Sequence, residues 1–364
     1  MEASLDGGDQ HPVFPQMKGQ TMIGDWTSDG ELFWFWRRNG PVNSLWAVRT
    51  NRFELTRSEP TSLYAGPLVL SAVVASRNGK ELYAIGSDPR GELSIYDPQS
   101  SRFVPFLGGI AASYVTYSPD RQWIAYVSYP DGTLWKSRAD GSDKMQLSFP
   151  PMGALLPRWS PDGKFIVFMD WFGSEHHSIY LVPSEGGQPR LLLSGPFEPA
   201  DPTWSPDSRL IAYGGNDGAT VESHIEILDL KTMVSTKVLG SEGLYSPRWS
   251  PDGKYIVAIT ITDHQIKLYN IEKQQWRPLA GSSANSAWPA WSHDSGFVYI
   301  SSGNRISRIN ISSEKLETVA TLEGVTWTSF ALGFAGWFDL TPDDRIMILR
   351  DTGTEDIYAL QLEY

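Results

Sequence analysis

Histidine side chains gather in three loops at similar places along successive segments of the chain. Four of the six histidines belong to this set: His176, His177, His224 and His264, with Glu175, Asp217 and Asp263 beside them. Imidazole and carboxylate groups from neighbouring loops can hold a divalent metal, which acidifies a water or a C–H bond for hydrolase or lyase chemistry. No HxxxH or HExxH spacing fixes two ligands on one element, so loop histidines on a solvated surface are the simpler interpretation. We therefore expect no cofactor, with a divalent metal as the alternative.

Aromatic residues with polar neighbours form a second candidate set in the same loops and in the loops that follow them. The set comprises Trp171, Phe172, Phe197, Trp288 and Trp327, with Glu198, Asp201 and Asn285 among them. Stacking planes beside hydrogen-bonding groups suit a sugar or a peptide, although packing of the loops against one another explains the same residues. We predict that these residues and the four histidines bind a ligand. No catalytic residue is predicted, because no GxSxG elbow, phosphate-binding loop or EF-hand spacing occurs.

A short phrase recurs along the whole chain. Residues 158 to 168 read RWSPDGKFIVF, and residues 248 to 259 read RWSPDGKYIVAI. Related phrases make eight in all: WTSDG at 26, ASRNG at 75, YSPDR at 117, WSPDG at 159, WSPDS at 204, WSPDG at 249, WSHDS at 291 and LTPDD at 340. The Asp or Asn of each phrase lies 42 to 49 residues after the one in the preceding phrase. This period is the length of one four-stranded propeller blade.

The chemistry of the phrase predicts the tip of a β-hairpin. Proline suits the second position of a type I turn, serine the first and glycine the fourth. Apolar runs typical of strands stand on both sides, as in residues 165–169 and 255–259. We interpret the Asp of each phrase as a turn residue and not as a catalytic carboxylate. The tryptophans before the turns are expected to fill the space between blades: Trp26, Trp159, Trp204, Trp249 and Trp291.

The predicted fold is all-β: an eight-bladed β-propeller of four-stranded antiparallel blades. Small sheets expose two faces that only neighbouring sheets can cover, and a ring solves this for every blade. The last blade ends with residues 356–362 and lacks an outer strand, so we expect the N-terminal segment around Val13 to Met17 to pair there. The prediction is a single, monomeric domain over residues 1–364, with the closing segment in 1–21 and the blades in 22–364.

Composition limits the possible partners and compartments. The chain has 30 basic and 42 acidic residues, a formal charge of −12 and no basic cluster, which argues against direct nucleic-acid binding. It has no cysteine, so disulfides and thiolate metal sites are excluded. The N-terminus lacks a basic and apolar leader, and no 18 apolar residues run together, so we expect neither an export signal nor a membrane segment. A periplasmic and a cytoplasmic location both stay open.

The Trp-Ser-Pro-Asp-Gly-Lys phrase, followed by a β run and an Ile-Tyr-Leu strand, resembles the repeat of TolB-type propellers over residues 22–364. Longer stretches at 126–152, 240–258 and 349–364 resemble the C-terminal propeller region of bacterial transcriptional regulators that begin with a winged-helix DNA-binding domain. This resemblance implies a sensory or interaction module. It supplies neither a ligand nor catalytic residues.

Three functions follow as expectations. The first is a non-catalytic propeller that binds a protein, a small molecule or a carbohydrate and, within a bacterial regulator, reports it to a DNA-binding domain. The second is a metal-assisted lyase or hydrolase acting on a carbohydrate-like substrate. The third is a cell-envelope scaffold of the TolB type. In each case we expect the ligand on the face of the longer loops, opposite the SPDG turns.

Overall fold

Strands make up almost all of the secondary structure, with a single 3-10 helix, η1 (Leu107–Gly109), among the described residues. The structure is a computed structural model that describes residues 20–39, 42–51, 54–55, 59–66, 68–171, 176–215, 223–279, 286–328 and 336–362. It divides the chain into two compact units, residues 1–89 with 353–364 and residues 90–352, and each is described by itself. The single domain expected over 1–364 stays a prediction. No helix of the described part is long and apolar enough to cross a membrane.

The first unit contains two antiparallel sheets. One runs in the order β1 (Gln20–Trp26), β2 (Leu32–Asn39), β3 (Val42–Asn51), β4 (Glu54–Leu55), with β5 (Thr61–Ala65) also paired to β3. The other runs in the order β32 (Thr354–Gln361), β7 (Glu81–Asp88), β6 (Val69–Ala75). Trp34, Leu45 and Leu82 lie in their shared apolar core.

The second unit contains six four-stranded antiparallel sheets. The first three are β10 (Ala112–Tyr117), β11 (Trp123–Ser128), β12 (Leu134–Arg138), β13 (Met145–Gln146); β14 (Ala154–Trp159), β15 (Phe165–Asp170), β16 (Ser178–Pro183), β17 (Arg190–Ser194); and β18 (Ala200–Trp204), β19 (Leu210–Gly215), β20 (His224–Asp229), β21 (Val234–Lys237). The other three are β22 (Leu244–Trp249), β23 (Tyr255–Thr260), β24 (Ile266–Asn270), β25 (Gln275–Pro278); β26 (Ala287–Trp291), β27 (Phe297–Ser302), β28 (Arg305–Asn310), β29 (Leu316–Thr321); and β30 (Phe338–Leu340), β31 (Ile346–Asp351), β8 (Gly91–Asp97), β9 (Arg102–Pro105).

The first strands of these six sheets contact one another in a circular order. Strands β10, β14, β18, β22, β26 and β30 each contact the next strand in the series, and β30 also contacts β10. The series therefore returns to its start after six sheets, an arrangement typical of a propeller. Within this unit each sheet has a neighbour on both faces, and side chains such as Ile124, Ile166 and Ile256 are fully buried.

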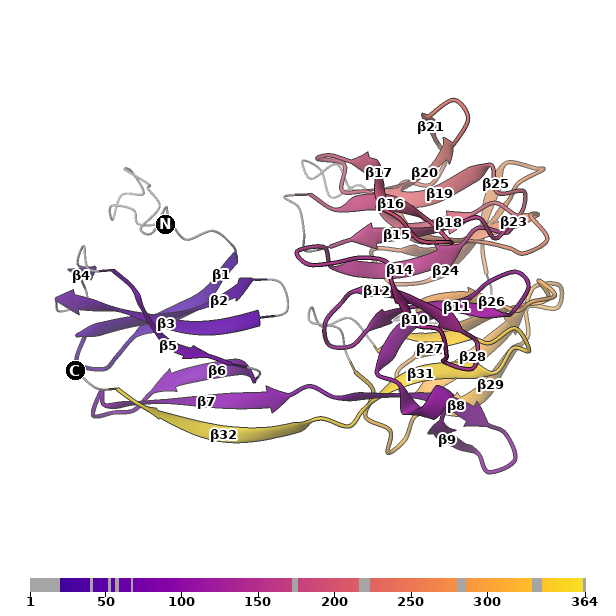
Figure 1. The fold of residues 1–364 in the computed structure, drawn as a ribbon. Helices are drawn as coiled ribbons and strands as arrows, with labels where there is room; N and C mark the ends of the chain where they lie inside the picture. Colours follow the sequence, from indigo (N-terminus) through magenta and orange to yellow (C-terminus); the bar gives the residue numbers. More distant parts are fainter. Residues whose placement is uncertain are drawn as a thin grey trace. The chain divides into compact units, whose positions relative to one another are not determined.

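The last sheet differs from the prediction. Its strands β30 and β31 are completed by β8 and β9, with Arg350 opposite Glu92 and Asp351 opposite Gly91. In Figure 1 the yellow β31 lies beside the purple β8, so segments about 250 residues apart in sequence share one sheet. This sheet is therefore completed by β8 and β9. The segment expected to do so, around Val13 to Met17, lies outside the described residues.

The reason for the difference lies in strand pairing that local sequence does not specify. Sequence alone suggests the hairpins β7–β8 and β31–β32, joined by short polar links. The structure pairs β7 with β32 and β8 with β31 instead. Each strand still gains one antiparallel partner, so the backbone hydrogen bonds that a local pattern predicts are satisfied in both arrangements. Residues 356–362 therefore do not join the last blade, and the described residues form eight sheets, one of five strands, six of four and one of three.

The turns confirm the structural interpretation of the repeated phrase. In the turn after β14 the Ser160 hydroxyl donates to Asp162 Oδ1 at 2.6 Å, and the same oxygen accepts the Lys164 N–H at 3.2 Å. The same serine-to-aspartate hydrogen bond recurs in four other turns, in Ser118–Asp120, Ser205–Asp207, Ser250–Asp252 and Ser292–Asp294. Each Asp thus organises its own turn.

Two of the repeated tryptophans join neighbouring sheets, as predicted. Trp204 Nε1 donates to the carbonyl of Arg158 at 3.0 Å, and Trp291 Nε1 donates to the carbonyl of Arg248 at 2.9 Å. Trp159 is equally buried, but its Nε1 has no hydrogen-bond partner. The repeated position is therefore buried in Trp159 and Trp204, and it forms a polar link between sheets in Trp204 and Trp291.

This difference allows a matched comparison of two substitutions. Trp204→Phe and Trp159→Phe remove similar apolar area, but only the first removes a hydrogen bond between sheets. We expect Trp204→Phe to lower the free energy of unfolding by about 1 kcal/mol more than Trp159→Phe, the net value of a typical hydrogen bond. Urea unfolding followed by tryptophan fluorescence measures both. Equal losses would mean that the link between sheets contributes nothing.

The turn aspartates also make stability depend on pH. The hydroxyl of the preceding serine is the main cause that lowers the pKa of Asp120, Asp207 and Asp294. Burial is the largest influence on Asp162 and Asp252 and raises their pKa. Hydrogen bonds from the serine, the backbone and the neighbouring lysine, together with the lysine charge, outweigh burial, so the pKa is lowered in these two residues as well. Native turns therefore bind protons less readily than the unfolded chain.

Because the native pKa values are depressed, the stabilisation is present above the ordinary Asp pKa of about 3.9 and is lost as pH falls through the lower native values. We expect the melting temperature to fall progressively below about pH 4. Circular dichroism melts between pH 6 and pH 2.5 measure this. As a control, Ser205→Ala should flatten part of the profile, whereas a wild-type melting temperature that is constant over this range would contradict the assignment.

Candidate functional site

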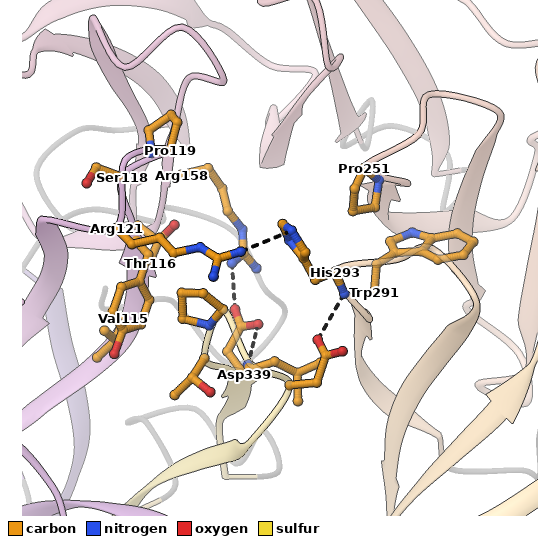
Figure 2. A pocket seen from close by; sticks show the side chains of 15 residues that line it. Val115, Thr116, Ser118, Pro119, Arg121, Arg158, Pro251, Trp291, His293 and Asp339 are labelled. Atoms are coloured by element: carbon orange, nitrogen blue, oxygen red, sulfur yellow. Dashed lines mark hydrogen bonds and ion pairs between the residues drawn. The ribbon is translucent and has the colours of Figure 1, made fainter.

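A pocket opens among the turns of the second unit, and side chains from five of its six sheets line it. Its volume is about 260 Å³, slightly below the range of ~300–1,000 Å³ that is common for small-molecule sites. Figure 2 shows this pocket from close by. The lining residues with polar or charged side chains are Thr116, Tyr117, Ser118, Arg121, Arg158, Trp291, His293, Asp339, Thr341 and Asp344. Val115, Leu340 and three turn prolines supply the apolar part of the wall.

The first strand of five of the six sheets in this unit contains an irregularity. Five of these strands shift register around a residue in the left-handed region: Tyr114, Leu156, Asp201, Ser246 and Trp288, with φ between 50° and 54°. A bulge of this kind adds a residue to one strand and re-aims the side chains that follow. In β14 it precedes Arg158, whose Nη1 reaches Asp339 Oδ2 on β30 at 2.6 Å.

A second pair of opposite charges joins two other first strands, β18 and β22. Arg248 occupies the same place in its repeat as Arg158, and its Nη2 is 3.8 Å from Asp201 Oδ1. Burial lowers the pKa of Arg248 to about 10, an effect that the Asp201 carboxylate partly offsets, so the guanidinium stays charged at neutral pH. Arg248 Nε and Asp201 Oδ1 are buried and have no hydrogen-bond partner. The ring of first strands thus encloses two ion pairs with no net charge.

The fourth position of each turn requires a left-handed backbone, and its residue type varies. Gly163 and Gly253 fill it in two turns, with φ of 75° and 76°. In the turns beside the pocket the position holds Arg121 and Asp344, both with φ of 61°. A left-handed residue with a Cβ costs roughly 1–2 kcal/mol relative to the right-handed conformation, a cost that glycine avoids. Two charged residues therefore occupy positions that suit glycine.

His293 connects these two residues at the pocket. Its Nε2 lies 3.1 Å from Arg121 Nη2, and its backbone N–H donates to Asp344 Oδ1 at 2.9 Å. Figure 2 shows both contacts as dashed lines, with Arg121 reaching across from one turn and His293 from another. Because arginine only donates, His293 Nε2 is the acceptor in this contact.

The loop side of the unit brings four of the predicted site residues together. His176 Nδ1 lies 2.8 Å from Glu198 Oε1, and the His177 backbone N–H donates to Glu198 Oε2 at 2.6 Å. Burial raises the pKa of Glu198, but these hydrogen bonds outweigh it and leave the pKa below its usual value. The His177 ring stacks on Trp171 with centroids 3.9 Å apart, and its own pKa is lowered by burial. The stacking face of Trp171 is therefore already covered on one side.

The other predicted residues lie apart from this cluster. Phe197 packs against His224 and fills the space over Gly215, where a Cβ would lie 1.8 Å from its ring. His264 instead packs edge-on against Tyr245, on the next sheet. Three more predicted residues are placed elsewhere: Asp201 in the buried ion pair, Trp288 against Tyr114, and Trp327 over Gly336.

The predicted Phe172 and Asn285 lie outside the described residues, as do Glu175 and Asp217. Among the residues whose placement the structure gives, no three His, Asp or Glu side chains form a group suited to a metal ion. Ligand binding by the loop residues stays a prediction, and their mutual hydrogen bonds and ring contacts agree with the simpler interpretation of loop packing.

Sequence reasoning missed the pocket because it treated the SPDG turns as structural only. The signal was nevertheless present in the repeat. Arg121 stands where the phrase has glycine, in YSPDR, and His293 stands where it has proline, in WSHDS. Asp344 ends LTPDD in the same way. Departures from the turn consensus at positions that favour glycine or proline therefore mark this pocket in the sequence.

Comparisons with known proteins support the fold and give little on activity. No protein-family model matches the chain. A distant relative, named "Uncharacterized peptidase YuxL", of Bacillus subtilis (strain 168), is 24% identical over 211 residues. The match covers 57% of this chain and 29% of the relative, so the chain spans less than a third of that protein's length.

Two solved structures share the architecture. The putative TolB from Agrobacterium tumefaciens has a TM-score of 0.56 at 20% identity, with 72% of this chain and 98% of that chain covered. TolB from Acinetobacter baumannii has a TM-score of 0.50 at 17% identity, with 93% and 81% covered. At these identities the likeness shows the fold and no more. The chain has a β-propeller fold of the TolB type.

Proposed function

We propose that the chain is a non-catalytic binding module whose ligand enters the pocket among the turns of the second unit. Arg121 carries the proposal. It holds a left-handed position that glycine fills in other turns, at a cost of about 1 kcal/mol, and it places a guanidinium at the pocket. Strained residues of this kind cluster at functional sites, where the strain accompanies the geometry that a ligand needs.

A structural role explains the two serines that replace glycine at the fourth turn position better than it explains Arg121. Ser208 and Ser295 have φ of 59° and 61°, and their hydroxyls accept the backbone N–H of Asp162 and Asp252 in the neighbouring turns. Each therefore satisfies a backbone donor between sheets. Among the described residues the hydrogen-bond partner of the Arg121 guanidinium is the His293 ring and not a backbone group. Its position is useful mainly to something that enters the pocket.

A finer proposal concerns the larger protein. The resemblance of residues 126–152, 240–258 and 349–364 to regulator propellers supports a role in which the module reports its ligand to a separate DNA-binding domain. The formal charge of −12 supports leaving DNA contact to that domain, because phosphate binding depends on clustered basic residues. The cell-envelope scaffold is the alternative within the same fold.

The substitution Arg121→Gly separates function from folding. Glycine relieves the left-handed strain, so we expect the variant to melt at the same temperature as the wild type or higher. A thermal-shift screen of small polar compounds and short peptides should then find ligands that raise the melting temperature of the wild type and not of Arg121→Gly.

Ser295→Gly is the matched control, because it relieves the same kind of strain in a turn whose residue 295 does not line the pocket. It should lose some stability with its hydrogen bond to Asp252 and keep the ligand response. The proposal fails if every compound that stabilises the wild type stabilises Arg121→Gly equally, or if no compound stabilises the wild type more than the variant.

A further inference from the structure

The pocket presents two opposite charges that have no oppositely charged partner. Arg121 has a histidine ring as its hydrogen-bond partner, and Asp344 has the backbone N–H of His293. No ion pair links either side chain to another described residue. Both stand at the left-handed fourth position of their turns, which belong to sheets whose first strands, β10 and β30, contact each other. One pocket thus offers a guanidinium and a carboxylate that are both available to a ligand.

A backbone role does not account for the charge on Asp344. At two other junctions a serine hydroxyl accepts the N–H of the neighbouring turn, in the pairs Ser208–Asp162 and Ser295–Asp252. Asp344 instead accepts the N–H of His293, which stands one turn position earlier than Asp162 and Asp252, and a neutral acceptor would suffice for that bond. The carboxylate therefore adds a charge beyond what the junction needs, as Arg121 does on the other side of the pocket.

The remaining walls are electrically neutral. Arg158 and Asp339 pair with each other at 2.6 Å, and their side chains are only 21% and 15% exposed, so neither charge is free for a ligand. Pro119, Pro251 and Pro342 give the wall apolar contact surface. A purely anionic ligand would meet the carboxylate of Asp344, and a purely cationic one would meet the guanidinium of Arg121. Charge complementarity favours a ligand that carries one charge of each sign.

We propose that the pocket binds a zwitterionic peptide-like ligand, with its carboxylate on Arg121 and its ammonium on Asp344. This inference rests on the proposed function of the pocket and names its ligand class. Guanidinium and carboxylate form strong charge-assisted hydrogen bonds with these groups. Arg121 keeps most of its five N–H donors for the ligand, because its one contact is to His293. The small volume of about 260 Å³ suits a short peptide.

Glycine peptides provide the test, because they vary the distance between ammonium and carboxylate without side chains. Diglycine, triglycine and tetraglycine differ by about 3.3–3.6 Å per residue when extended. Isothermal titration at low salt should show that one length binds better than the others. Its N-acetylated and C-amidated forms, each lacking one charge, should bind about 10- to 100-fold more weakly, as expected for loss of a hydrogen bond to a charged group.

Two variants assign each charge to its residue. Arg121→Gly should bind the free and the C-amidated peptide equally weakly. Asp344→Asn keeps an acceptor for the His293 N–H and tolerates the left-handed backbone. It should no longer distinguish the free from the N-acetylated peptide. Ser295→Gly should behave as the wild type throughout. Each variant should thus lose its discrimination against one modified peptide, which tests the contact between that residue and one end of the peptide. General damage to the fold would weaken the binding of all peptides alike.

Specific outcomes overturn the inference. If the N-acetylated or the C-amidated peptide binds as tightly as the free peptide, the pocket recognises only one of the two charges. Normal binding of the N-acetylated peptide would point to a ligand recognised by its carboxylate alone. If no glycine peptide binds at millimolar concentration while another compound binds in an Arg121-dependent way, the zwitterion class is wrong and the binding function stands. If no compound depends on Arg121, both fail.

Discussion

The structure depends on how the last sheet of the second unit is completed. A small antiparallel sheet has two faces and two edges, and it becomes stable only when neighbours cover the faces and no long edge stays unpaired. Five of the six sheets in this unit are continuous in sequence. The sixth needs β31 and β8, which pair from opposite ends of the unit. Through this pairing β30 comes to lie between β26 and β10, and the circular series of contacts is complete.

The site follows from a scaffold that repeats while a few side chains vary. Each turn of the second unit is fixed by its aspartate and by a serine, or in one turn a threonine, and its fourth residue has a left-handed backbone. Where glycine stands there, the turn ends without a side chain. Where Arg121 and Asp344 stand there, the same geometry presents charges to a pocket. The proposed binding site thus uses positions whose conformation the fold already guarantees, at a modest cost in strain.

Sequence reasoning was most reliable where structure is local. The serine–aspartate turns, the antiparallel sheets and the role of Trp204 and Trp291 between sheets all follow from residue types a few positions apart. The partner of β31 did not follow, since pairing it with β8 or with β32 satisfies the same backbone groups. A subtler signal was present in Gly91, because a Cβ there would lie 2.8 Å from Leu349 of the opposing strand. The pocket was missed for a related reason: it forms only when turns distant in sequence meet, as Arg121 and His293 do.

The pairing of β8 with β31 can be tested directly with a disulfide, because the chain has no cysteine of its own. Glu92 and Arg350 are opposite each other, form an ion pair at 3.2 Å and are partly exposed. Antiparallel partners lie about 4.5–5.5 Å apart at Cα, within the span of a disulfide. On mild oxidation Glu92→Cys/Arg350→Cys should form an intramolecular crosslink that raises the melting temperature, whereas Glu92→Cys/Arg345→Cys should not. If the first pair stays reduced, or links only between molecules, then β31 does not pair with β8 and the account of the second unit is wrong.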